Sequence, residues 1–151
     1  LAERARRVVW LCPEPPGRWG SGDSDILRYR PLCTTLAHCA TVADLERALG
    51  FYCGVLGFQL TQRYGRGAAF IASGDYHHHI GLNTWQGRGA PPPPADALGL
   101  RHFSVELPDQ KELEEVIARV DAAGLPSDLT EDGLLVHDPS QNGVVLRVGG
   151  K

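Results

Sequence analysis

Residues 44–57 read DLERALGFYCGVLG, and this stretch decides the fold that the sequence predicts. Asp44 is a residue type that caps helix N-termini, and Gly57 is one that ends helices. Between them, apolar residues recur at the spacing of one helix face, at Leu45, Leu49, Tyr52 and Leu56. The stretch therefore predicts an amphipathic helix. Short apolar runs bounded by Gly and Asp predict the strands around it, one before it at 36–42 and three after it at 58–64, 68–72 and 77–83.

The second half of the chain repeats this order. A strand is predicted over Leu100–Leu107, and residues 109–112 (DQKE) resemble a capping box that opens a second helix. The apolar face of that helix is predicted to hold Leu113, Val116, Ile117 and Val120, with Gly124 as its end. Short strands are predicted at 127–129, 134–137 and 143–148. Two β-α-β-β-β units of nearly equal length support each other as a prediction.

The rest of the chain divides around these two units. Residues 1–33 are turn-rich and aperiodic, and they predict an irregular arm or a strap on a neighbouring surface. Residues 34–151 are predicted to form one domain, with a first module over 34–85 and a second over 99–151. The segment 86–98 between them carries four consecutive prolines, which favour a stiff, extended connector.

Composition excludes several classes of function. Lys and Arg number 15 against 18 Asp and Glu, so no excess of positive charge is present to neutralise nucleic-acid phosphates. No apolar run approaches the roughly 20 residues of a membrane helix, and the N-terminus lacks a secretory signal pattern, so a cytoplasmic protein is expected. The four cysteines lack Cys-x-x-Cys spacing and are expected to be reduced thiols: Cys12, Cys33, Cys39 and Cys53.

Four stretches resemble a known family. Residues 44–58 and 137–146 (HDPSQNGVVL) resemble motifs of the vicinal oxygen chelate superfamily, which includes glyoxalase I, bleomycin-resistance proteins and extradiol catechol dioxygenases. Residues 74–85 (GDYHHHIGLNTW) and 99–109 (GLRHFSVELPD) resemble, more specifically, the C-terminal half of two-domain catechol dioxygenases. The resemblance extends over about residues 34–148.

The resemblance implies a fold and a chemistry. It implies an α+β fold in which two βαβββ modules form an open, cup-shaped mixed sheet around a ligand. In the extradiol enzymes this cup holds a divalent metal, usually Fe(II), on two histidines and one carboxylate, with open positions for a catecholate and dioxygen. The resemblance therefore implies a small aromatic ligand for this chain, and Fe(II), another divalent metal or no metal as its cofactor.

The family places one ligand on the first strand of a module, seven residues before the helix-capping Asp. In module two this position is His102, seven residues before Asp109. In module one it is Ala37, and His38 lies one residue away. Because side chains alternate along a strand, this offset is expected to point His38 at the wrong side unless a bulge restores it.

The family carboxylate lies at the centre of the last strand of a module. Here the two central positions are Gly81 and Val145, which offer no metal-binding side chain. His77 and His79 share strand parity with Gly81 and are expected to face the cup. His79 and His102 are therefore the candidate catalytic residues and the candidate metal ligands.

The other candidate site residues are predicted to bind the ligand. They are Cys39, Tyr76, His77, Asn83 and Trp85. Each has a structural alternative: the histidines could be hydrogen-bonded strand residues, Cys39 a small core residue, and the aromatic residues packing groups. His137, directly before Asp138, is expected to be a turn residue.

Several functions remain open at this point. The first is an extradiol-type ring-cleaving dioxygenase that uses a cup histidine as acid-base catalyst. The alternatives are a metal-free ligand-binding protein like the bleomycin-resistance members, a glyoxalase-like enzyme, or a structural cup protein that pairs with another chain. A homodimer is expected, because small members of the family often dimerise.

Overall fold

The computed structural model describes residues 35–38, 42–84 and 102–150. The first unit contains β1 (Thr35–His38), α2 (Val42–Leu49), the π-helix η2 (Gly50–Val55), β2 (Gln59–Tyr64), β3 (Ala68–Ala72) and β4 (Ile80–Asn83). The second contains β5 (His102–Leu107), α3 (Gln110–Ala122), β6 (Ser127–Thr130), β7 (Gly133–His137) and β8 (Gly143–Val148). Two βαβββ units in an α+β fold are therefore confirmed. The predicted arm (1–33), the predicted connector (86–98), Cys39 and Trp85 lie outside the described residues.

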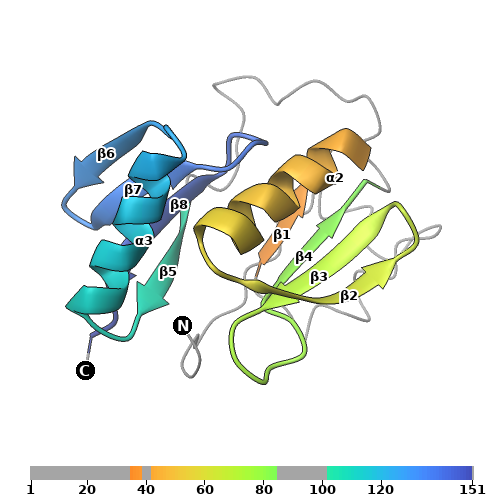
Figure 1. Ribbon diagram of the computed structural model, residues 1–151, viewed down its shortest axis with the longest axis horizontal. Helices are drawn as coiled ribbons and strands as arrows, with labels where there is room; N and C mark the ends of the chain where they lie inside the picture. The colour runs from red at the N-terminus through yellow and green to blue at the C-terminus, as the bar shows by residue number, and fades with distance from the viewer. Residues whose placement is uncertain (1–34, 39–41, 85–101, 151) are drawn as a thin grey trace, which may run out of the picture.

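Each unit forms its own four-stranded mixed sheet, and the two sheets have the same topology. The strand orders are β1-β4-β3-β2 and β5-β8-β7-β6. The first and last strands of each unit pair in parallel, and the remaining pairs are antiparallel. In Figure 1, α3 lies over β5 and β8, while α2 lies over β1 and β4. The two sheets are thus equivalent halves of one open arrangement.

The first helix starts earlier than the sequence pattern predicts. α2 begins at Val42, so Asp44 lies in its first turn and is not the N-cap, and the predicted strand over 36–42 ends at His38. A carboxylate in the first turn is still favourable because it interacts with the positive end of the helix dipole, and Asp44 also forms an ion pair with Arg47. The helix continues as η2 and ends as predicted at Gly57, whose φ of 84° is readily adopted only by glycine.

The second helix matches its prediction closely. The Asp109 carboxylate accepts a hydrogen bond from the backbone N–H of Glu112 at 2.9 Å, so Asp109 is the N-cap of α3. Val116 and Val120 are buried, and Gly124 follows the helix with a φ of 64°.

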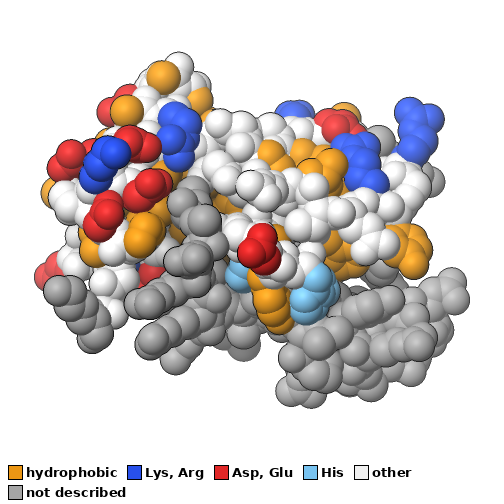
Figure 2. Space-filling model, turned by 60° about the horizontal axis from the view of Figure 1, so that its bottom comes forward, with side chains coloured by type: hydrophobic (Ala, Val, Ile, Leu, Met, Phe, Trp, Pro, Cys, Tyr) orange, Lys and Arg blue, Asp and Glu red, His pale blue; other side chains and the backbone are white. Residues whose placement is uncertain are grey.

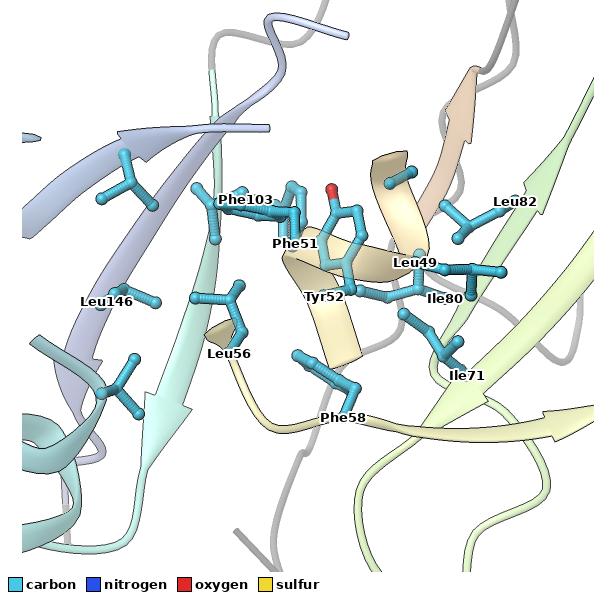
Figure 3. Packing of buried hydrophobic residues seen from close by; sticks show 14 of the residues in the cluster. Leu49, Phe51, Tyr52, Leu56, Phe58, Ile71, Ile80, Leu82, Phe103 and Leu146 are labelled. Atoms are coloured by element: carbon cyan, nitrogen blue, oxygen red, sulfur yellow. The ribbon is translucent and has the colours of Figure 1, made fainter. Parts of the chain in front are cut away.

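The two units share one hydrophobic core. Phe51 and Leu56 at the end of the first helix lie beside Phe103 and Leu146 of the second sheet (Figure 3). Polar contacts reinforce this joint: the Tyr52 hydroxyl donates to Asp138 Oδ2 at 2.8 Å, and Arg119 Nε donates to the Val55 carbonyl oxygen at 2.8 Å. The units therefore depend on each other for burial.

Each sheet turns one face toward this core, and we call the opposite one the non-core face. In the second sheet Val136, Val144 and Phe103 lie opposite one another across three strands, and all three belong to the core. In the first sheet Ile71 and Ile80 form such a core row. Because successive residues point to opposite faces, the rows next to these belong to the non-core face.

None of the helices within the described residues is long and apolar enough to cross a membrane.

Candidate functional site

The histidine-rich run lies in a loop rather than in a strand. β4 begins only at Ile80, because the chain turns at Gly74 (φ 67°) and returns to the sheet where the His79 N–H donates to the Ile71 carbonyl oxygen at 2.8 Å. The predicted strand over 77–83 is therefore too long. Strand alternation therefore does not apply to His77 and His79, which precede β4; His77 is exposed, while His78 and His79 are both buried.

A bulge in the neighbouring edge strand anchors this loop. The register of β2 against β3 shifts between Leu60 and Gln62, which leaves Thr61 out of the ladder. The Thr61 hydroxyl lies 3.0 Å from the Phe70 carbonyl oxygen and 2.7 Å from the His77 carbonyl oxygen. The position of the histidines thus depends on a residue far away in the sequence.

His79 is held by the backbone at the end of β3. Its Nδ1 accepts a hydrogen bond from the Ser73 N–H at 3.1 Å. A neutral imidazole that accepts at Nδ1 carries its proton on Nε2, so in this state His79 offers a donor at Nε2 and no lone pair for a metal there. Its assignment as a metal ligand stays a prediction, and it requires the bond to Ser73 to break.

His78 is the histidine of this run that the sequence analysis did not predict to face the cup. Its ring lies 5.0 Å from the ring of Phe70, which occupies the non-core face of the first sheet next to the Ile71 row. The ring is buried, and its Nε2 has no hydrogen-bond partner among the described residues. Burial lowers the pKa of His78 below its ordinary value of 6.5, and the neighbouring His77 and His79 lower it further. His78 is therefore a neutral imidazole at pH 7, and a neutral imidazole can accept a hydrogen bond at one ring nitrogen.

Two further predicted ligand-binding residues lie within this loop and at the far end of β4. Tyr76 is 43% exposed, and its ring lies 4.3 Å from that of His77 and 4.8 Å from that of His79. Asn83 is half-buried at the end of β4. Figure 2 shows histidine side chains beside a hydrophobic one at the surface of the described part. The loop thus presents a group of aromatic rings.

The second sheet holds the other candidate histidine. His102 is half-buried at the start of β5 and lies opposite Gly143. His137 also lies opposite Gly143, from the other side, so it ends β7 and is not a turn residue. Farther along this sheet, Glu106 and Arg147 form an ion pair at 2.8 Å.

The donor set does not fit the iron site of the extradiol enzymes. The two carboxylate positions are occupied by Gly81 and Val145, Asp75 is exposed, and Glu106 is engaged by Arg147. Among the residues that the structure describes, no group of three His, Cys, Asp or Glu side chains is placed to hold a metal ion. The described residues therefore do not form the iron site of two histidines and one carboxylate.

The chain is similar to known proteins in both sequence and fold. A profile of the glyoxalase/bleomycin resistance protein/dioxygenase superfamily matches residues 35–144. The chain belongs to this superfamily. A catechol-2,3-dioxygenase of Bacillus subtilis (strain 168) is 50% identical to this superfamily member over 99 residues, which make up 65% of the chain and 35% of the relative. The chain thus corresponds to only part of that enzyme.

Solved structures of superfamily proteins share the fold of this member. Lactoylglutathione lyase from Agrobacterium tumefaciens superposes with a TM-score of 0.53 and 24% identity over 74% of this chain and 88% of that one. A glyoxylase/bleomycin resistance protein/dioxygenase domain from Frankia sp. EAN1pec gives a TM-score of 0.57 and 17% identity over 76% and 94% of the two chains.

Proposed function

We propose that this dioxygenase-like protein binds a catechol-type aromatic molecule against the non-core face of its first sheet, beside the 73–79 loop. The observation that carries the proposal is the buried Nε2 of His78, which has no hydrogen-bond partner in the part of the chain that the structure describes. Membership of the superfamily and the 50% identity to a catechol-2,3-dioxygenase support the same class of ligand.

The chemistry of the loop suits a phenolic ligand. A buried polar atom without a partner costs about 1–3 kcal/mol, and a ligand hydroxyl that donates to it would remove that cost. The neighbouring Phe70 ring offers an apolar surface for stacking at 5.0 Å from the His78 ring. His78 stays neutral at pH 7 because burial lowers its pKa, so its Nε2 can accept a hydrogen bond from the hydroxyl.

Binding is separable from ring cleavage in this proposal. The carboxylate positions hold Gly81 and Val145, so we assign the described residues no step that passes through a metal. Their part is to bind the ring, to accept a hydroxyl hydrogen bond and to exclude water from the contact.

The test is a calorimetric titration at pH 7.5 with a chelator present, comparing catechol with 1,2-dimethoxybenzene. The two ligands have the same ring, but only catechol can donate a hydrogen bond. We expect catechol to bind at least about tenfold tighter, which corresponds to one hydrogen bond of about 1.4 kcal/mol. His78→Gln should remove this preference, whereas His77→Gln, at an exposed neighbour, should keep it. Equal affinities for the two ligands in the unmodified chain would refute the proposal.

Ring cleavage by this chain is the second candidate, and the identity to the Bacillus subtilis enzyme favours it. The test is oxygen consumption with catechol after anaerobic loading with Fe(II), with His102→Ala as the comparison. Turnover that depends on His102 would establish a site that includes residues beyond those described. The homodimer expected from the family stays a prediction, which sedimentation velocity tests.

A further inference from the structure

The bulge in β2 makes one side chain a bridge between two segments. Thr61 lies in an edge strand of the first sheet (Figure 1) and is left out of the pairing with β3. Its hydroxyl lies 2.7 Å from the carbonyl oxygen of His77 and 3.0 Å from that of Phe70. A hydroxyl carries one proton, and the shorter distance is the usual one for an O–H···O hydrogen bond, so we assign the proton to His77. Thr61 therefore holds the backbone of the 73–79 loop from outside that loop.

This bond and a second one hold the backbone on both sides of His78. The His77 carbonyl belongs to the peptide group that precedes the Cα of His78, and Thr61 binds it. The His79 N–H belongs to the peptide group that follows, and it donates to the Ile71 carbonyl oxygen at 2.8 Å. Because each peptide group is planar, holding both of them restricts the direction in which the His78 side chain leaves the backbone.

The buried position of His78 carries a cost that these bonds offset. Its Nε2 is buried without a hydrogen-bond partner within the described part of the chain, and that cost is comparable to the net gain from one or two hydrogen bonds. A turn of the loop toward water would satisfy the nitrogen. The His78 ring nevertheless lies 5.0 Å from the Phe70 ring, and the Thr61 hydroxyl joins the backbone of Phe70 to the residue before His78.

We propose that Thr61 is a positioning residue of the ligand site, whose hydroxyl keeps His78 buried beside Phe70 with Nε2 free for a ligand hydroxyl. The ligand contact rests on the proposed function, whereas the placement of His78 does not depend on any ligand. Thr61 acts through the backbone, since its own side chain is exposed on the edge strand.

The first test repeats the calorimetric titrations with variants of Thr61. Thr61→Val removes the hydroxyl and keeps the branched shape, so the preference for catechol over 1,2-dimethoxybenzene should fall from about tenfold to about threefold or less. Thr61→Ser keeps the hydroxyl and should keep the preference. Thr130→Val is the matched control, because Thr130 is also exposed on an edge strand and its hydroxyl donates to the Gly133 carbonyl oxygen at 2.8 Å. This control should keep the full preference.

The second test needs no ligand and follows the His78 imidazole by NMR during a pH titration. The signal of His78 is identified by its absence in His78→Gln. Burial holds the pKa of His78 below its ordinary value of 6.5, so exposure of the ring in Thr61→Val should raise this pKa toward 6.5. Thr61→Ser and Thr130→Val should leave it unchanged. A role of Thr61 in strand stability alone would not move this pKa.

The outcomes separate the role of Thr61 from the proposed function. An unchanged pKa of His78 in Thr61→Val, or a Thr61→Ser variant that behaves like Thr61→Val, would overturn the proposal. Equal affinities of the unmodified chain for the two ligands would instead refute the proposed function, and the ligand-free titration would still decide whether Thr61 positions His78. Because Thr61 is exposed, Thr61→Val should fold normally, which its urea midpoint checks.

Discussion

The hydrogen bond between Tyr52 and Asp138 joins the two modules, and removing it should measurably destabilise the protein. The Tyr52 hydroxyl donates to Asp138 Oδ2 at 2.8 Å, and both side chains are buried. The other Asp138 contacts come from its own turn: the N–H groups of Ser140 and Asn142 and the Asn142 amide. Tyr52 is therefore the residue of the first module that donates a hydrogen bond to the Asp138 carboxylate.

Tyr52→Phe deletes the hydroxyl and keeps the ring. The edge-to-face contacts of the ring with Phe51 at 5.0 Å and Phe58 at 6.3 Å remain available to phenylalanine. A hydrogen bond to a charged group contributes about 1.5–3 kcal/mol, so we expect the free energy of unfolding to fall by that amount. With a urea m-value of about 2 kcal/mol/M, the midpoint should fall by about 1 M.

The assay is urea unfolding at pH 7 followed by circular dichroism. Tyr64→Phe is the matched control, because Tyr64 is 58% exposed on β2 and its loss should change the free energy by less than about 0.5 kcal/mol. A double-mutant cycle with Asp138→Asn should give a coupling energy of about 1 kcal/mol or more. A Tyr52→Phe midpoint equal to that of Tyr64→Phe would refute this account of the joint between the modules.

Three further predictions concern single residues. Because the pKa of His78 is lowered in the folded state, the unfolded chain binds more protons than the folded chain below pH 6.5. The free energy of unfolding should therefore fall as the pH drops through that value. His78→Gln should reduce this loss between pH 7.5 and 5.5, as measured by urea unfolding, whereas His77→Gln should not. Asp109→Ala should lower the free energy of unfolding by about 1 kcal/mol through loss of the N-cap, while Asp109→Asn, which can still cap, should recover most of it in the same assay. Gly133→Ala should lower the thermal midpoint strongly, because φ at this position is 136° and the new Cβ would lie 2.4 Å from a backbone oxygen of β8. Gly150→Ala is the control, because a Cβ there meets open space and should leave the midpoint unchanged. Equal midpoints for the two variants would contradict the steric argument.

The second helix and the last strand were predictable because local chemistry defines them. Asp109 caps α3 through a bond to a residue three positions away, and β8 runs over Gly143–Val148 as predicted. The start of α2 was not predictable from its capping signal, since Asp44 is equally favourable inside the first turn. The change to a π-helix at Gly50 leaves the apolar spacing almost the same, so the pattern does not reveal it.

The candidate site was predictable in its residues more than in its geometry. His102 lies on a strand as predicted, because the apolar pattern of β5 is local to that segment. The histidine run follows a loop that is set by Thr61, which reaches His77 through a bulge in another strand. Such a long-range contact has no local signal, and the imidazole of His78 was therefore missed.

The order of strands in the second sheet has a consequence for how the protein is made. β8 is last in the sequence but lies inside the sheet, between β5 and β7. During synthesis β5 must therefore wait for β8 to emerge before it gains a neighbour in the sheet that the structure describes. Pairing over such a separation closes a large loop, which slows folding. A nascent chain in which β8 has not yet emerged should thus leave β5 unpaired, and the second module should complete its folding only once β8 is available.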